Sequence, residues 1–68
     1  MVYQRIRDLR EDADMKQRDV AKYLHCSQQV YSNYELGQRD IPTDILIKLS
    51  RFYKVSVDYI LGLKDDPN

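Results

Sequence analysis

The sequence is poor in the residues that build disulfides, metal centres and membrane spans. It has one cysteine, Cys26, and one histidine, His25, so it can form neither an internal disulfide nor a structural zinc site. No uninterrupted apolar run exceeds three residues, whereas a membrane-spanning helix needs about 20. The first residues lack the basic flank and apolar stretch of a secretory signal. We therefore expect a cytoplasmic protein that contacts no membrane and holds no metal or other cofactor.

The chain also has few turn-forming residues and no net charge. The 68 residues include two glycines and two prolines, with no low-complexity linker, and they leave room for one hydrophobic core. Eleven basic residues balance eleven acidic ones, and no basic stripe stands out. This balance excludes an affinity for nucleic acid that rests on bulk positive charge. We expect one domain over residues 1–62, followed by a short tail over residues 63–68.

Apolar residues recur at helical spacing in four segments, over residues 2–13, 17–24, 28–35 and 42–54. The residues that carry this spacing are Val2, Ile6, Leu9, Ala13, Val20, Ala21, Leu24, Tyr31, Tyr34, Ile45, Leu46, Leu49 and Tyr53. No segment shows the strict alternation of a half-buried strand. These patterns predict helices and no sheet.

Capping residues and helix breakers mark the predicted helix ends. Ser27 suits the N-cap of the third helix, and Ser56 suits the N-cap of a short fifth one. Pro42 fits the first turn of the fourth helix, and Gly62 ends the fifth. Residues 64–68 are expected to form a loose tail. The prediction is an all-α domain of five short helices.

Residues 17–36 have the pattern of a helix-turn-helix, in which two short helices pack across each other. The small residue Ala21 suits the crossing point, His25 falls in the tight turn, and an apolar clamp surrounds them. The clamp comprises Val20, Leu24, Cys26, Tyr31 and Tyr34. The chain resembles the Xre family, the phage-repressor and Cro class of bacterial and phage regulators. The matching string comprises Ile6–Arg10, Gln17, Tyr34–Gly37, Leu46–Leu49 and Val55–Leu61, and covers residues 3–62.

The resemblance implies a repressor-like fold and sequence-specific binding of double-stranded DNA by a transcriptional regulator, a repressor acting as a dimer on a two-fold operator. It implies base contacts from Gln28, Gln29 and Asn33 at the recognition helix. A glutamine amide matches N6 and N7 of adenine in the major groove. The alternative for these three residues is an ordinary solvated helix face. The resemblance also implies a phosphate contact for Gln17, and the alternative for this residue is a plain polar helix start. Further phosphate candidates are Lys16, Arg18, Gln38 and Arg39, although each exposed lysine or arginine could instead serve only solubility.

The resemblance also implies an ion pair between Arg10 and Glu35, with a structural role. The sequence departs from the family at three turns or caps. His25 stands where many members have glycine, Lys16 replaces the usual Ser or Thr cap before Gln17, and Asp14 stands where glycine commonly ends the first helix. We expect Lys16 to weaken the start of the second helix by about 1 kcal/mol unless Asp14 or a water molecule replaces the cap.

Six tyrosines give the chain an unusual aromatic content. Aromatic rings can stack on unpaired bases, but Tyr31, Tyr34 and Tyr53 fall on core faces, which favours packing. Phe52, Val57 and Tyr59 fall outside the main pattern and are candidates for a homodimer interface. The alternative for these three is peripheral core.

The competing function is an antitoxin that binds a toxin protein and regulates its own operon. Antitoxins of this kind usually carry a toxin-wrapping segment, and the short stretch after Gly62 disfavours that function. A toxin gene alongside would reverse the ranking. We expect no small-molecule effector, because no second domain is visible to hold one. We expect no enzyme either, because Cys26 lies on the apolar clamp and no phosphate loop or metal-ligand spacing occurs.

Overall fold

A computed structural model describes residues 2–67 of the chain, and it confirms the all-α prediction of five helices. The helices are α1 (Gln4–Asp12), α2 (Gln17–Leu24), α3 (Gln28–Leu36), α4 (Thr43–Tyr53) and α5 (Val57–Ile60). Residues 2–67 contain no strand. None of the helices in this range is long and apolar enough to cross a membrane.

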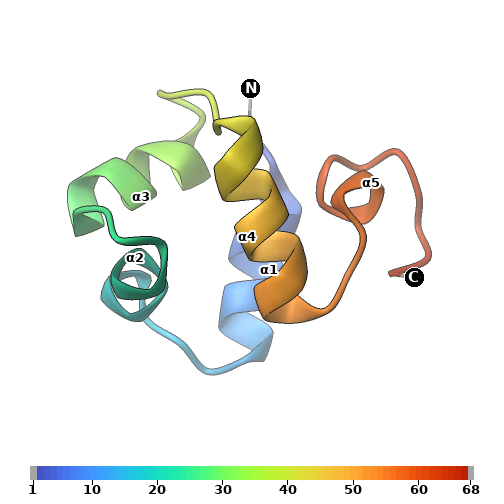
Figure 1. The fold of residues 1–68 in the computed structure, drawn as a ribbon, viewed down its shortest axis with the longest axis horizontal. Helices are drawn as coiled ribbons and strands as arrows, with labels where there is room; N and C mark the ends of the chain where they lie inside the picture. The colour runs from blue at the N-terminus through green and yellow to red at the C-terminus, as the bar shows by residue number, and fades with distance from the viewer. Residues whose placement is uncertain (1, 68) are drawn as a thin grey trace.

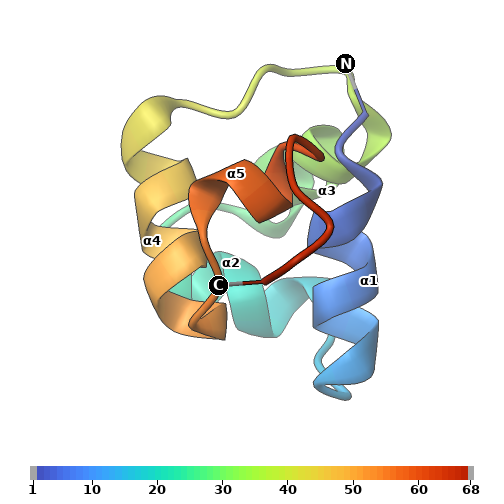
Figure 2. The ribbon, with the colours of Figure 1, turned by 90° about the vertical axis from the view of Figure 1, so that its right-hand side faces the viewer.

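The helices form a simple three-part arrangement (Figure 1). The α2 and α3 pair lies on one side, α1 and α4 occupy the middle, and α5 lies on the opposite side. Seen from that opposite side, α5 is in front, between α4 and α1 (Figure 2). Of all helix pairs, α2 and α3 pack most extensively against each other. The helix-turn-helix therefore forms one flank of the molecule, supported from behind by α1 and α4.

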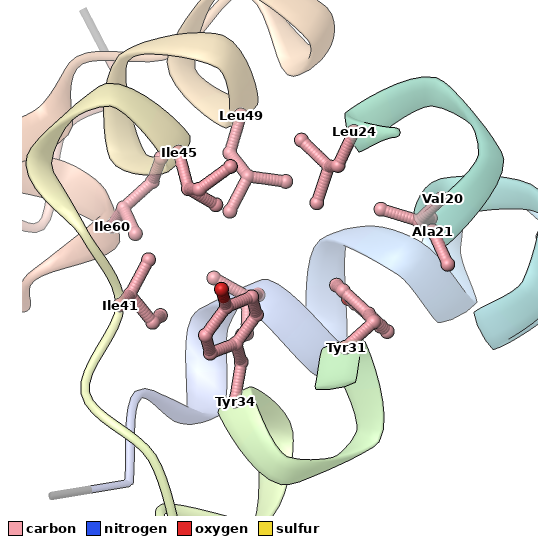
Figure 3. Close-up of a cluster of buried hydrophobic side chains, with 10 residues drawn as sticks. Val20, Ala21, Leu24, Tyr31, Tyr34, Ile41, Ile45, Leu49 and Ile60 are labelled. Atoms are coloured by element: carbon pink, nitrogen blue, oxygen red, sulfur yellow. The ribbon is translucent and has the colours of Figure 1, made fainter. Parts of the chain in front are cut away.

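The hydrophobic core joins all five helices. Its buried side chains come from α2, α3, α4, α5 and the segment before α4, and they converge between the helices (Figure 3). Ile6 of α1 completes the cluster, and it is fully buried together with Tyr31 and Leu49. Ala21 is 2% exposed where α2 meets this cluster. Each large apolar side chain of this kind stabilises the fold by roughly 1.5–3 kcal/mol.

The boundaries of α1 and α4 differ from the sequence prediction. Helix α1 begins at Gln4, and Val2 lies outside it with 55% of its surface exposed. Pro42 is the N-cap residue of α4, where its φ is −60° and its ψ 151°, and does not lie in the first turn. An extended N-cap conformation suits proline, because the cap residue needs no intrahelical N–H donor there.

Two expected caps and one expected turn are present. The Ser27 hydroxyl accepts a hydrogen bond from the Val30 N–H at 3.1 Å, and the Ser56 hydroxyl accepts one from the Tyr59 N–H at 3.0 Å. His25 ends α2 with φ 58° and ψ 39°, in the left-handed region that glycine occupies most easily. Asp14 and Lys54 also have a φ near that of His25, 56° and 58°. Three turns therefore carry backbone strain that glycine would relieve.

Of the predicted loose tail over residues 64–68, the structure describes residues 64–67, which make hydrogen bonds to the rest of the fold; Asn68 lies outside the described residues. The Leu63 N–H donates to the Asp58 carbonyl at 2.9 Å, and the Ser56 N–H donates to the Pro67 carbonyl at 2.8 Å. Arg5 of α1 donates to the Tyr59 carbonyl at 2.8 Å, to the Lys64 carbonyl and to the Asp65 carboxylate at 2.8 Å. Residues 63–67 therefore fold back against α5 and α1. No local pattern signals Arg5, because its partners lie more than fifty residues away.

Candidate nucleic-acid interface

The first turn of α3 is polar and exposed, and the side of the helix that faces the core is buried. Tyr31 is fully buried and Tyr34 is 4% exposed, so these two rings anchor the helix in the core. Gln28 and Gln29 are exposed in the first turn of the same helix. In Figure 1 that first turn lies at the outer edge of the molecule, on the side away from α5. The helix is therefore held by one face while its first turn is free to contact a ligand.

The three predicted base-reading residues are not equivalent. The Gln29 Nε2 group donates to Asn33 Oδ1 at 3.1 Å, one helical turn away, and Asn33 is half-buried. The Gln28 side chain makes no hydrogen bond with any residue in the range 2–67. The structure thus brings Gln29 and Asn33 together as a pair and leaves Gln28 separate. Whether these residues contact bases stays a prediction.

The start of α2 is stabilised in a way that the sequence analysis missed. The Asp19 carboxylate accepts a hydrogen bond from the Lys16 backbone N–H at 2.9 Å. This is one half of a capping box; the other half is missing, because a lysine ammonium cannot accept a hydrogen bond from the first turn. The sequence indicates Asp14 or a water molecule as the substitute for the missing Ser or Thr cap, and the structure shows a bond to Asp19 at this helix start instead. The signal for Asp19 was its three-residue spacing from Lys16, which is the spacing of a capping box.

The ion pair between Arg10 and Glu35 joins α1 to the end of α3. Arg10 Nε lies 2.7 Å from Glu35 Oε2, and Arg10 Nη2 lies 3.2 Å from Oε1. The two side chains are 13% and 4% exposed. Arg10 also donates from Nη1 to the Met15 carbonyl at 2.9 Å, which fixes the chain between α1 and α2. The Arg10 guanidinium therefore links α1, the segment between α1 and α2, and the end of α3.

Gln17 belongs to the same network. Its Nε2 group donates to Glu35 Oε1 at 3.1 Å, so the side chain expected to bind phosphate is already engaged within the protein. A phosphate oxygen only accepts hydrogen bonds, and an amide nitrogen carries two hydrogens. One hydrogen on Nε2 and the backbone N–H at the positive end of α2 are the groups that Gln17 can offer to a phosphate. The contact itself stays a prediction.

The network sets the ionisation of its buried members. Burial raises the pKa of the Glu35 carboxyl, but the hydrogen bond from Arg10 and those of neighbouring polar groups outweigh it, so the pKa lies below its ordinary value. Burial raises the pKa of Tyr53 to about 12 and also raises that of Tyr31. The Tyr31 and Tyr53 hydroxyls are buried and find no hydrogen-bond partner within residues 2–67. Glu35 is therefore the charged acceptor around which Arg10 and Gln17 are arranged.

The remaining phosphate candidates lie on the surface beside these elements. Lys16 and Arg18 are exposed on either side of Gln17, and Gln38 and Arg39 are exposed just beyond the end of α3. A groove of about 380 Å³ opens between the start of α1, the start of α2 and the end of α3. It is lined by Val2, Gln4, Arg7, Arg10, Gln17, Glu35 and Leu36.

The three residues predicted to form a dimer interface are half-buried. The Phe52 ring packs against Tyr23 of α2, with ring centroids 4.3 Å apart. The Tyr59 ring lies under the Arg5 guanidinium, 4.2 Å from its centroid. Phe52 and Tyr59 therefore contact different parts of the same chain, and both retain an exposed portion. Their role between two chains stays a prediction.

The comparisons with known proteins agree with this geometry. The helix-turn-helix family matches residues 6–60. The uncharacterized HTH-type transcriptional regulator YobD of Bacillus subtilis (strain 168) is 41% identical over 68 residues, which cover 100% of this chain and 61% of that protein. The HTH-type transcriptional regulator ImmR of the same organism is 44% identical over 62 residues, which cover 91% of this chain and 48% of that protein. The chain therefore spans about half to three-fifths of the length of these relatives. On this match, the chain belongs to the helix-turn-helix family and is of the Xre type that its sequence resembles.

Proposed function

We propose that this chain binds double-stranded DNA in a sequence-specific manner and regulates transcription, as a repressor, with α3 as its recognition helix. One observation carries the proposal: Gln28 and Gln29 are exposed in the first turn of a helix whose opposite face is anchored by buried Tyr31. Recognition helices of this class enter the major groove by their N-terminal residues. The names of the two relatives, both transcriptional regulators, support the same function.

The phosphate backbone is held, in this proposal, by groups on both sides of α3. The backbone N–H of Gln17 at the start of α2 binds one phosphate, helped by exposed Lys16 and Arg18. Gln38 and Arg39, which are exposed beyond the end of α3, bind on the other side. These contacts fix the position of α3 on the duplex but carry no sequence information. Because the chain is neutral overall, non-specific affinity is weak and specificity depends on the geometry of α3.

The proposed assembly is a homodimer on a two-fold operator. One recognition helix reads only a few base pairs, so two copies are needed to discriminate a site. The candidate surface comprises Phe52 of α4 and Val57 and Tyr59 of α5. Helix α5 lies on the opposite side of the molecule from α2 and α3 (Figure 1), whereas the Phe52 ring packs against Tyr23 of α2. The two recognition helices must lie about 34–36 Å apart, one turn of duplex.

The test of the function begins with selection of bound sequences from a random DNA pool. We expect a two-fold motif to be enriched, with half-sites about ten base pairs apart. Replacing Gln28 with Ala should then cost about 1–3 kcal/mol at the preferred site and relax the preference at one position. Replacing Arg39 with Ala should weaken binding to all sequences about equally. A pool that shows no enrichment, or a Gln28→Ala variant with the full preference, would refute direct reading by α3.

The dimer is tested separately with Val57→Asp. Val57 is the first residue of α5, where the helix dipole favours a carboxylate, so the substitution leaves the helix intact while placing a charge in the proposed interface. We expect binding isotherms on the two-fold site to be cooperative for the wild type and to lose that cooperativity in the variant. One-to-one binding to a single half-site, unchanged by Val57→Asp, would contradict the dimer.

A further inference from the structure

We propose that Asn33 acts as a positioning residue for Gln29, so that the two amides read a single base as one unit. The inference rests on the proposed function, because it concerns how α3 would recognise DNA. It departs from the expectation that Asn33 reads a base of its own. The observation behind it is the hydrogen bond from Gln29 Nε2 to Asn33 Oδ1, at 3.1 Å.

The chemistry of a primary amide makes this arrangement useful. The amide nitrogen carries two hydrogens, and only one of them lies on the same edge as the carbonyl oxygen. Adenine is read by that edge, because the oxygen accepts from N6 and the hydrogen beside it donates to N7. Asn33 takes the other, outer hydrogen of Gln29 in our proposal. The reading edge of Gln29 then stays free, and its amide plane is fixed before DNA arrives.

Asn33 is suited to the role because its own position is fixed. Residues four apart on a helix lie one above the other on the same face. Asn33 is half-buried, and its backbone carbonyl accepts the N–H of Gln38 at 3.0 Å in the turn that ends α3. The bond between the two side-chain amides is itself exposed. The backbone of Asn33 is therefore fixed, and its partial burial restricts the side chain that holds Gln29. An exposed glutamine on its own would have to be ordered entirely at the moment of binding.

Gln28 provides an internal comparison. It is exposed in the same first turn of α3, and its side chain makes no hydrogen bond with residues 2–67. A change at Asn33 that acted through the stability or tilt of α3 would affect the bases read by Gln28 and Gln29 alike. A change that acts through the amide pair would affect only the base read by Gln29. The two bases are identified beforehand as the positions at which Gln28→Ala and Gln29→Ala relax the preference.

The experiment is a double-mutant cycle on the DNA site selected from the random pool. Binding is measured by fluorescence anisotropy on the preferred duplex and on duplexes that are changed at each of the two bases. The full chain is used as wild type, Asn33→Ala, Gln29→Ala, the double variant and Asn33→Asp. We expect Asn33→Ala to reduce the preference at the Gln29 base about three- to tenfold, the size of one neutral hydrogen bond, and to leave the Gln28 base unchanged. In the Gln29→Ala background, Asn33→Ala should have no further effect on preference. Asn33→Asp keeps the accepting oxygen, so it should retain the preference at the Gln29 base, while binding to all sequences becomes weaker.

Three results of the binding experiment would overturn the proposal. Asn33→Ala could leave the Gln29 base unaffected, it could relax both bases equally, or it could relax a further base even in the Gln29→Ala background. The last result would make Asn33 an independent reader. A readout without DNA separates this proposal from the proposed function. The order parameter of the Gln29 side-chain amide, measured by NMR on the free protein, should fall in Asn33→Ala and be retained in Asn33→Asp. If it is already low in the wild type, the pair does not exist in solution, and the positioning role fails whether or not the protein binds DNA.

Discussion

The strongest prediction concerns the ion pair between Arg10 and Glu35. Among residues 2–67, Arg10 supplies the one guanidinium bonded to Glu35, whose side chain is 4% exposed, and Arg10→Met removes it. Gln17 would still donate to Glu35, but a buried carboxylate that loses its cationic partner typically destabilises a fold by about 3–5 kcal/mol. A domain of this length has a total free energy of unfolding of about 3–10 kcal/mol, at 0.05–0.15 kcal/mol per residue. Arg10→Met should therefore bring the protein to the edge of unfolding at room temperature.

Thermal unfolding followed by circular dichroism at 222 nm measures the effect. For a domain of this size each kcal/mol lowers the Tm by about 4–8 °C, so Arg10→Met should lower it by roughly 12–40 °C. The matched control is Arg7→Met, on the same helix. Arg7 lies 3.5 Å from Glu11 with both side chains about half exposed, and such pairs contribute at most about 0.5 kcal/mol. If Arg10→Met lowered the Tm no more than Arg7→Met does, the ion pair would have no structural role.

Three further predictions follow from the same structure. The pKa of Glu35 is lowered in the fold. The stability that its charged form confers is therefore present above about pH 4.3, the value for an unfolded glutamate, and is lost as the pH falls further. Because Glu35→Gln lacks this titrating group, its Tm should fall less steeply with decreasing pH than the Tm of the wild type. Because His25 is exposed with φ 58°, His25→Gly should raise stability by about 0.5–1 kcal/mol, whereas His25→Ala, which keeps the strain, should not. Ala21 is 2% exposed, and Ala21→Leu should cost about 1–3 kcal/mol in urea denaturation, while Lys22→Leu at the exposed neighbouring position changes stability by less than about 0.5 kcal/mol.

Local patterns in the sequence were sufficient to place the helices. Helix α2 has the bounds that its apolar spacing predicts, and Ser27 and Ser56 cap the helices at which serine was expected to act. These features depend on residues within one or two turns of each other, where side-chain chemistry and backbone geometry are directly linked. The left-handed conformation of His25 follows for the same reason, since a two-helix turn of this length needs one residue with positive φ.

Contacts between distant parts of the chain were not visible in the sequence. The bonds from Arg5 to residues 59–65 depend on the path of the chain after α5, which no local spacing encodes. The bond between Gln17 and Glu35 depends on how α2 and α3 pack. The sequence therefore indicated a phosphate contact or a plain polar helix start for Gln17, and no partner within the protein. The pair of Gln29 and Asn33 has a spacing that was visible, but polar residues four apart are common on solvated helix faces. Its significance came only with the half-buried position of Asn33.

Replacement of one base nitrogen by a C–H group tests the central claim, direct reading by α3, most directly. Adenine at the position assigned to Gln28 is replaced by 7-deazaadenine, which lacks the N7 acceptor and keeps N6 and the base pair. Binding of this duplex and of the unmodified one is compared for the wild type and for Gln28→Ala. We expect the modified base to weaken the wild type by about 1–3 kcal/mol and to leave Gln28→Ala unaffected, because the hydrogen bond is already absent there. An equal loss for both proteins, or no loss for the wild type, would contradict the claim that Gln28 reads this base.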